Sequence, residues 1–311
     1  MKEDKEQLMQ KTVVVWLGAL LCCVLWGSAF PCIKIGYQLF QIGSDQTATQ
    51  ILFAGCRFAL AGILALVIGS LLRGKILVPK KQSYGKIVKL CLFQTVAQYV
   101  FFYIGLANTS GVKASIIEAV NVFIAIFVAS LCFHQEKLTT RKIMGSMIGF
   151  LGVILVNLTG NEINAHFSLM GEGFIFLSTV AYAFSSVLMK GYSTEEDPVC
   201  LSGYQFLVGG LVMILCGGAM GGRLTIMTVG GAAMLIYLAL VSAIAYSVWG
   251  ILLKYNPISK VAVFGFMNPV FGVLLSALLL KEYQMIGPMS IISLILVCLG
   301  IYIVNKEKKL M

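Results

Sequence analysis

Charged residues are scarce in this 311-residue sequence: only 12% of its residues are Asp, Glu, Lys or Arg, whereas 59% are hydrophobic. Soluble domains carry about 25% charged residues, so this low charge and a mean hydropathy of +0.92 exclude an ordinary soluble fold. The balance is typical of a membrane protein with several transmembrane helices. The net charge of +10 does not indicate a nucleic-acid partner, because most Lys and Arg residues lie in short loops and tails.

Several enzyme motifs are missing as well. There is no GxxxxGK[ST] phosphate loop, no HExxH and no GxSxG, which argues against an ATP motor, a zinc protease and a serine hydrolase. The only Asp residues are Asp4, Asp45 and Asp197, and no DxxD pair occurs. The nine cysteines are scattered through apolar runs without a CxxC, which indicates apolar fillers. We therefore expect no enzyme activity, no cofactor and no metal.

Ten segments are apolar enough to cross a bilayer core, which needs about 20 residues per helix. They are residues 13–36, 48–72, 87–106, 112–133, 142–158, 171–190, 199–220, 230–253, 258–280 and 285–305. The charged residues before the first segment are expected to be a disordered tail. Lys and Arg lie mostly on the side of the N-terminus, so the positive-inside rule places both termini in the cytoplasm.

The fourth and ninth segments share a pattern: Ser130 and Glu136 recur, at the same spacing, as Ser276 and Glu282. The fourth and ninth helices of such a chain cross the membrane in opposite directions. The sequence therefore predicts an all-α membrane protein with ten transmembrane helices as two inverted five-helix repeats, a common plan of secondary transporters. The predicted parts are a cytoplasmic tail at 1–12, repeats at 13–160 and 161–305, and a second tail at 306–311.

Motifs spread over nearly the whole chain resemble the drug/metabolite transporter superfamily, in particular its EamA-type ten-helix carriers. They are Trp26-Gly27-Ser28-Ala29-Phe30 with Lys34, Arg57-Phe58 with Ala61-Gly62, Glu136-Lys137-Leu138-Thr139 with Gly145, Gly149 and Gly152-Val153, Asn268-Pro269-Val270-Phe271, and Leu280-Lys281-Glu282. The resemblance implies a central cavity, alternating access and small organic substrates, such as amino acids or amines, that are usually exported. The sequence departs from this pattern in its fourth segment, where Asn121-Val122-Phe123 replaces a frequent Pro and where Glu118 is not a family hallmark.

Glu118 lies roughly 10 Å inside the predicted start of the fourth segment. A charge deep in a membrane helix costs about 2.5–3.5 kcal/mol. One interpretation is a site for a cationic substrate group or a coupling proton, and the other is a fixed ion pair with Arg57 or Lys113. Asn121 and Ser115 lie on the same helical face as Glu118, and they would either line the same cavity or bond neighbouring helices.

Further polar and aromatic side chains would line the cavity or simply pack between helices. They are Trp26 in the first segment, Gln94 and Gln98 in the third, Tyr182 in the sixth, Tyr246 and Trp249 in the eighth, and Phe264 and Asn268 in the ninth. The aromatic ones would form a wall around an organic or cationic ligand. For Arg57, in the middle of the second segment, a structural pairing is favoured over direct binding of a carboxylate.

The sequence thus predicts a secondary active transporter of small organic metabolites in the cell membrane, most consistent with an exporter of amino acids or related amines. Export of cationic drugs or quaternary amines is the alternative, and a channel is the alternative from a different class. The expected partners are a small-molecule substrate, the lipid bilayer and protons as a candidate coupling ion, without nucleic acid.

Overall fold

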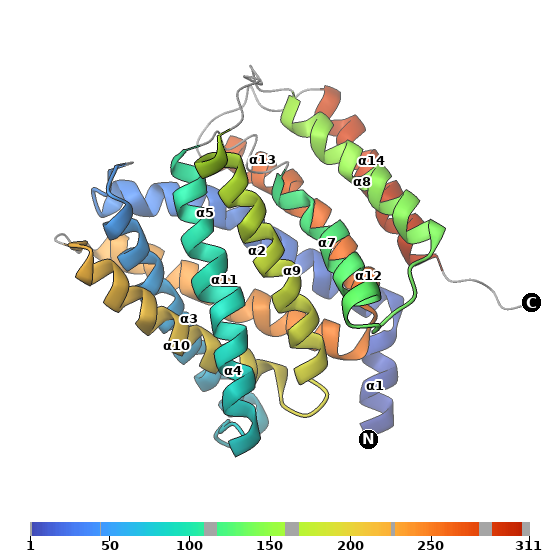
Figure 1. Cartoon of the computed structure of the whole chain (residues 1–311), viewed down its shortest axis with the longest axis horizontal. Coiled ribbons are helices and arrows are strands. Elements are labelled where there is room, and N and C mark those ends of the chain that lie inside the picture. Colours follow the sequence, from blue (N-terminus) through green and yellow to red (C-terminus); the bar gives the residue numbers. More distant parts are fainter. Residues whose placement is uncertain are drawn as a thin grey trace, which may run out of the picture.

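The computed structural model describes residues 2–43, 45–108, 117–158, 168–224, 228–279 and 288–306, and these residues form helices and short connections without a strand. Figure 1 shows them as one helical bundle, with α8 and α14 together at one edge and α3 and α10 on the opposite side. Five residues named above lie outside the described residues: Lys113, Ser115, Leu280, Lys281 and Glu282.

The helices follow the predicted segments to within a few residues over most of the chain. The first half contains α1 (Lys2–Gln10), α2 (Thr12–Leu39), α3 (Thr47–Arg73), η1 (Lys81–Ser83), α4 (Tyr84–Leu90), η2 (Cys91–Ala97), α5 (Gln98–Ala107), α7 (Asn121–Phe127), η3 (Val128–Cys132) and α8 (Thr140–Leu158). The second half contains η4 (Leu169–Gly173), α9 (Phe174–Tyr192), α10 (Pro198–Ala219), α11 (Val229–Tyr255), α12 (Ile258–Ala262), η5 (Val263–Phe266), α13 (Met267–Leu279) and α14 (Pro288–Asn305).

Six of the described helices are long and apolar enough to cross a membrane by length and composition. They are Thr12–Leu39, Thr47–Arg73, Lys81–Gly105, Leu169–Tyr192, Pro198–Ala219 and Val229–Tyr255. Three shorter apolar helices, Ile117–Cys132, Ile258–Gly272 and Ile291–Asn305, occupy the fourth, ninth and tenth predicted segments, and α8 occupies the fifth. The predicted all-α membrane fold is confirmed.

The expectation of a disordered N-terminal tail is wrong for the described residues, because Lys2–Gln10 form α1. The end of α1 is held by two hydrogen bonds: Asn256 Nδ2 donates to the Met9 carbonyl at 3.0 Å, and Lys260 Nζ donates to the Gln10 carbonyl at 3.2 Å. Both donors come from the second half of the chain. Local sequence could not predict an order that depends on such distant partners.

The helix contacts repeat between the two halves as an inverted duplication requires. Helices α5 and α7 of the first half pack on α9 of the second half. In the same way, α11 and α13 of the second half pack on α2 of the first half. The two most extensive contacts join helices of equal rank in the two repeats, α3 with α10 and α8 with α14. This pattern is that of two interlocked five-helix repeats related by a pseudo-twofold axis, and Figure 1 shows two of its pairs, α3 with α10 and α8 with α14.

Glycines allow α3 and α10 to pack backbone against backbone. They recur every two helical turns, as Gly55, Gly62 and Gly69 in α3 and as Gly203, Gly210 and Gly217 in α10. A Cβ atom at Gly210 would lie 2.2 Å from the Ala59 nitrogen, and one at Gly62 would lie 2.5 Å from the Leu207 nitrogen. No side chain fits at such distances, so these glycines set the approach of the helices that carry the candidate site.

Candidate functional site

Four of the predicted aromatic residues meet inside the bundle. The Trp26 ring lies 5.1 Å from the Tyr246 ring and 5.0 Å from the Trp249 ring, centroid to centroid. Tyr182 approaches the same indole edge-on at 6.4 Å. Edge-to-face pairs contribute about 0.5–1.5 kcal/mol each beyond area burial. Because the rings come from α2, α9 and α11, they lie where the two repeats meet.

Tyr99 extends this group toward α3 and α10. Its hydroxyl is 2.9 Å from the Tyr246 hydroxyl, and its ring centroid is 4.3 Å from that of Phe58. Phe58 stacks on Phe206 at 5.3 Å. We call the set the aromatic cluster. Its members are Trp26, Phe58, Tyr99, Tyr182, Phe206, Tyr246 and Trp249.

Arg57 lies beside the aromatic cluster and is only 3% exposed. Its Nε donates to the Leu238 carbonyl at 3.2 Å, and its Nη2 donates to the Ser242 hydroxyl at 3.0 Å. Both acceptors belong to α11. The guanidinium carbon also lies 5.1 Å from the centre of the Phe58 ring. No ion pair with Glu118 is present among the described residues, so the contacts that hold Arg57 there are neutral.

The two predicted glutamines have different surroundings. Gln94 is buried and its Oε1 accepts a hydrogen bond from Gln205 Nε2 at 3.1 Å, while Thr95 Oγ1 donates to Gln205 Oε1 at 2.5 Å. This chain of bonds ties η2 to α10 and uses the Gln94 carbonyl. The Gln98 Oε1, in contrast, is buried and has no donor in the part of the chain that the structure describes. The side-chain oxygen of Gln98 therefore remains available to accept a hydrogen bond from a ligand, whereas that of Gln94 is used to join η2 to α10.

Glu118 lies half-buried near the start of the helix Ile117–Cys132. Its carboxyl makes no hydrogen bond or ion pair with another described residue. The neighbouring Ile117 packs against the hydrophobic core that contains every member of the aromatic cluster except Trp249. Asn121 lies on the side of the second repeat, since a Cβ atom at Gly265 of η5 would be 3.7 Å from its Oδ1.

The two candidates from the ninth segment lie apart from the aromatic cluster's ring contacts. Phe264 is 2% exposed, its ring lies 6.2 Å from that of Trp16, and its carbonyl accepts from Cys23 Sγ at 3.1 Å. These contacts are typical of a packed core residue. Asn268 is half-buried, and within the described ranges its Oδ1 is buried without a donor.

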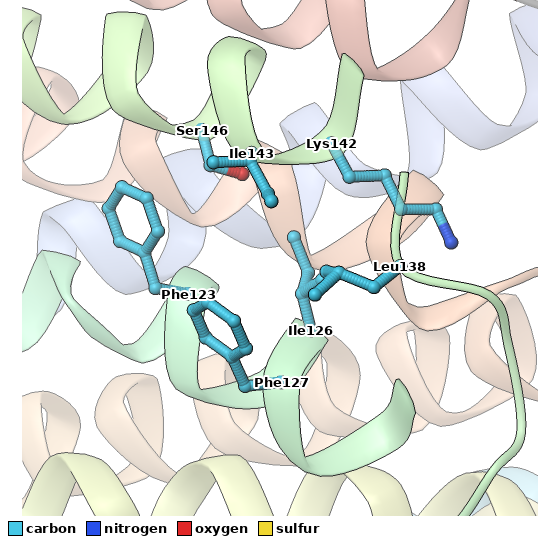
Figure 2. A pocket seen from close by; sticks show the side chains of 7 residues that line it. All are labelled: Phe123, Ile126, Phe127, Leu138, Lys142, Ile143 and Ser146. Atoms are coloured by element: carbon cyan, nitrogen blue, oxygen red, sulfur yellow. The ribbon is translucent and has the colours of Figure 1, made fainter. Parts of the chain in front are cut away.

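Figure 2 shows a separate small pocket between α7 and α8. Its lining is mostly apolar and consists of Phe123, Ile126, Phe127, Leu138, Lys142, Ile143 and Ser146. The Lys142 Nζ is already bonded to Glu136 Oε2 at 3.2 Å and to the Lys137 carbonyl at 2.7 Å. None of the predicted site residues lines this pocket, so it is not the candidate substrate site.

A carboxylate of the first repeat caps a helix of the second repeat at the end of the bundle where the chain begins. Glu136 Oε1 accepts the Ser259 N–H at 3.1 Å, and its Oε2 accepts the Ser259 hydroxyl at 2.9 Å. Ser259 lies in the first turn of α12, whose free N–H groups favour an anion. We call these bonds the Glu136 cap. The Glu136 cap holds the two repeats together at this N-terminal end.

A second group at the N-terminal end joins the connection after α3 to the connection after α9. Glu196 Oε2 accepts from the Lys80 N–H at 2.9 Å and the Ser83 hydroxyl at 2.8 Å, and Glu196 Oε1 accepts from the Asp197 N–H at 3.0 Å. Burial raises the pKa of Glu196, but these hydrogen bonds outweigh it and hold that pKa below its ordinary value. The neighbouring Asp197 pairs with Arg73 at 2.6 Å.

Besides Tyr99, two tyrosines of the site were not among the sequence candidates. Tyr37 lies three helical turns after Trp26, and Tyr103 lies one turn after Tyr99, so each shares a face with a cluster member. The Tyr103 hydroxyl lies beside the Tyr37 hydroxyl and the Arg57 guanidinium. Extending the polar and aromatic stripes by whole turns would have found both.

Relatives of known sequence include proteins described as transporters or efflux pumps. The chain is 26% identical to an uncharacterized transporter of Archaeoglobus fulgidus, over 94% of this chain and 99% of that protein. It is 25% identical to a probable amino-acid metabolite efflux pump of Escherichia coli K12, over 92% of both chains. A protein of the same description from Salmonella typhimurium is also 25% identical over 92% of both.

A solved crystal structure has the same fold, with a TM-score of 0.72 over 94% of this chain and 97% of that chain. At 15% identity this likeness shows the fold alone. The model of the EamA-like transporter family matches the sequence twice, over residues 14–158 and 169–306, once for each half of the bundle. The chain therefore belongs to the EamA-like transporter family of the drug/metabolite transporter superfamily, and it is a multi-pass membrane protein.

Proposed function

We propose that this protein exports amino acids or related amines across the cell membrane by alternating access, with Glu118 as its ionisable group. The observation that carries the proposal is the Glu118 carboxyl, half-buried in a membrane helix without a bonding partner among the described residues. A carboxylate in such a place costs free energy that a substrate ammonium or a coupling proton would recover. The two relatives described as probable amino-acid metabolite efflux pumps support the substrate class.

In this proposal the N-terminal end of the bundle faces the cytoplasm, because most Lys and Arg residues lie there. The bonds between the repeats at that end, the Glu136 cap and the group around Glu196, must break for the substrate to enter from the cytoplasm. Both termini would be cytoplasmic.

Export of cationic drugs or quaternary amines is the second candidate, and the aromatic cluster favours it. A quaternary ammonium has no N–H to donate and binds instead over the faces of Trp and Tyr rings. Trp26 is surrounded by three such rings, at 5.0, 5.1 and 6.4 Å. Glu118 would supply the negative charge in this case too.

Counterflow in proteoliposomes tests the function. Vesicles loaded with L-leucine, L-phenylalanine or L-lysine should take up the labelled amino acid, and the uptake should saturate. Glu118→Gln should lower the transport rate at least about tenfold, since it removes the half-buried ionisable carboxyl, and should abolish the pH dependence. The control is Glu195→Gln, which removes an exposed carboxylate paired with Lys86 and should leave transport unchanged.

Two results would contradict the proposal. Wild-type rate and pH dependence in Glu118→Gln would remove Glu118 from the mechanism. Ohmic current without saturation or trans-stimulation would identify a channel instead of a carrier.

A further inference from the structure

Arg57 carries a charge near the middle of the membrane. It lies ten residues into the 27-residue helix α3, or about 15 Å from the helix start at 1.5 Å per residue. The hydrocarbon core is about 30 Å thick, so this is close to its midplane. A guanidinium does not lose its proton in a protein. Its charge at this depth must therefore be compensated by other groups.

The described residues provide only neutral compensation. Arg57 Nε and Nη2 donate to a carbonyl and a hydroxyl of α11, and the Phe58 ring lies 5.1 Å from the guanidinium carbon. Within the described ranges no carboxylate pairs with Arg57. Buried arginines are ordinarily paired with an acid, because neutral acceptors do not balance the charge. Among the residues that the structure describes, this site therefore has no counter-charge.

Two buried tyrosine hydroxyls without a well-formed hydrogen bond lie close to the same guanidinium. The Tyr103 hydroxyl lies beside both the guanidinium and the Tyr37 hydroxyl, yet neither hydroxyl makes a well-formed hydrogen bond with a described residue. The Trp26 Nε1 is a third buried donor without a partner there. All three side chains pack in one hydrophobic core. A buried hydroxyl without a partner costs about 1–3 kcal/mol.

Of the common substrate groups, a carboxylate would supply both the counter-charge for Arg57 and the hydrogen-bond acceptors for the tyrosine hydroxyls. It supplies one negative charge and two oxygens with about four lone pairs, and arginine binds it through a planar fork of N–H groups. We propose that Arg57, Tyr37 and Tyr103 form the subsite that binds the carboxylate of the exported substrate. This inference rests on the proposed export function and narrows it from amines in general to amino acids that keep their carboxylate.

A purely structural role for Arg57 makes different predictions. If Arg57 only ties α3 to α11, the hydroxyls of Tyr37 and Tyr103 are irrelevant to substrate choice. If the subsite exists, removing one hydroxyl weakens ligands that carry a carboxylate and leaves their decarboxylated analogues unaffected. Tyr→Phe changes keep the ring and its packing, so they separate these two cases without disturbing the fold.

The experiment measures the binding of matched ligands to the purified full-length protein by thermal shift and by competition. The pairs are L-leucine with isoamylamine, L-phenylalanine with phenethylamine, and L-lysine with cadaverine. L-Phenylalanine methyl ester keeps the side chain and the ammonium group of phenylalanine but lacks the negative charge of the carboxylate. In at least one pair the wild type should bind the amino acid at least about tenfold more tightly than the amine.

Tyr103→Phe and Tyr37→Phe should each lower the affinity for that amino acid by about tenfold, because each variant loses one hydrogen bond to a charged group. The affinity for the matching amine should change by less than twofold. Tyr302→Phe, at an exposed position, is the control and should change neither. Arg57→Lys keeps the charge but loses the fork, and should weaken only the amino acids. If that variant does not fold, the tyrosine variants decide the result.

The carboxylate subsite is overturned if the wild type binds the amino acid, its amine and its ester with equal affinity. It is also overturned if Tyr103→Phe lowers the affinity for all three ligands equally. Absence of binding by every amino acid overturns it as well. Counterflow distinguishes failure of the subsite from failure of the export function. Saturable, trans-stimulated flux of the amines alone would support a transporter and refute the carboxylate subsite. Absence of flux for every probe would refute both proposals.

Discussion

The contact between α3 and α10 yields a prediction whose size follows from the structure. A Cβ atom at Gly210 would lie 2.2 Å from the Ala59 nitrogen and 2.7 Å from the Ala59 Cα, both backbone atoms. Favourable carbon contacts need about 3.5 Å, so Gly210→Ala must push the helices apart by about 1 Å. Overpacking of this kind costs about 1–3 kcal/mol. Because Arg57 lies two residues from Ala59, the same shift should also lower transport.

The matched control is Gly218→Ala, in the same helix, where a Cβ atom meets nothing within 4 Å. Ala gains about 1 kcal/mol of helix propensity over Gly at Gly210, in the helix interior, and no more than that at Gly218, in the last turn of α10. A lower stability of Gly210→Ala than of Gly218→Ala therefore reflects the steric cost at Gly210. Thermal unfolding in detergent, followed by tryptophan fluorescence, should give a lower Tm for Gly210→Ala than for Gly218→Ala. Equal Tm values would refute the close approach of α3 and α10.

Two further predictions concern the N-terminal end. Glu136→Gln removes the charge that Ser259 and Lys142 bind; since a hydrogen bond to a charged group contributes about 1.5–3 kcal/mol, amide exchange of α12 should accelerate at least about tenfold, and unchanged exchange would contradict the Glu136 cap. The depressed pKa of Glu196 means that its ionised form stabilises the fold above the unfolded-state pKa, near 4.5, and that this stability is lost as the pH falls through the folded-state pKa. Glu196→Gln should therefore lower the Tm at pH 7 and flatten the loss of Tm below pH 4.5, and an acid profile parallel to that of the wild type would show that Glu196 does not contribute.

The fold was predictable because the bilayer imposes lengths on the sequence. Each crossing needs a long apolar run, and Pro198–Ala219 or Val229–Tyr255 is such a run, with no charged residue except Lys254 near the end of the second. The inverted arrangement was predictable from one repeated motif and the parity of the helices between its copies. The order of α1 was not, since it depends on Asn256 and Lys260.

The site was predictable only in part, for a different reason. Helical spacing put Tyr246 and Trp249 on one face, and both do contact Trp26. Spacing could not say which polar groups are satisfied by partners elsewhere in the chain. Gln94 and Gln98 look equivalent in sequence, yet Gln94 is bonded to Gln205, 111 residues away. Which buried polar atoms stay free is a property of the whole fold.

The two glycine stripes give the interface between α3 and α10 the form of a contact in a symmetric homodimer. In a twofold dimer each subunit presents the same patch to its partner. Here two helices of equal rank present equivalent stripes to each other, antiparallel, within one chain: Gly210 meets Ala59, and Gly62 meets Leu207. This is the packing that two copies of a five-helix subunit would adopt if they were inserted in opposite orientations. The halves are thus joined by a self-complementary surface as well as by their covalent connection.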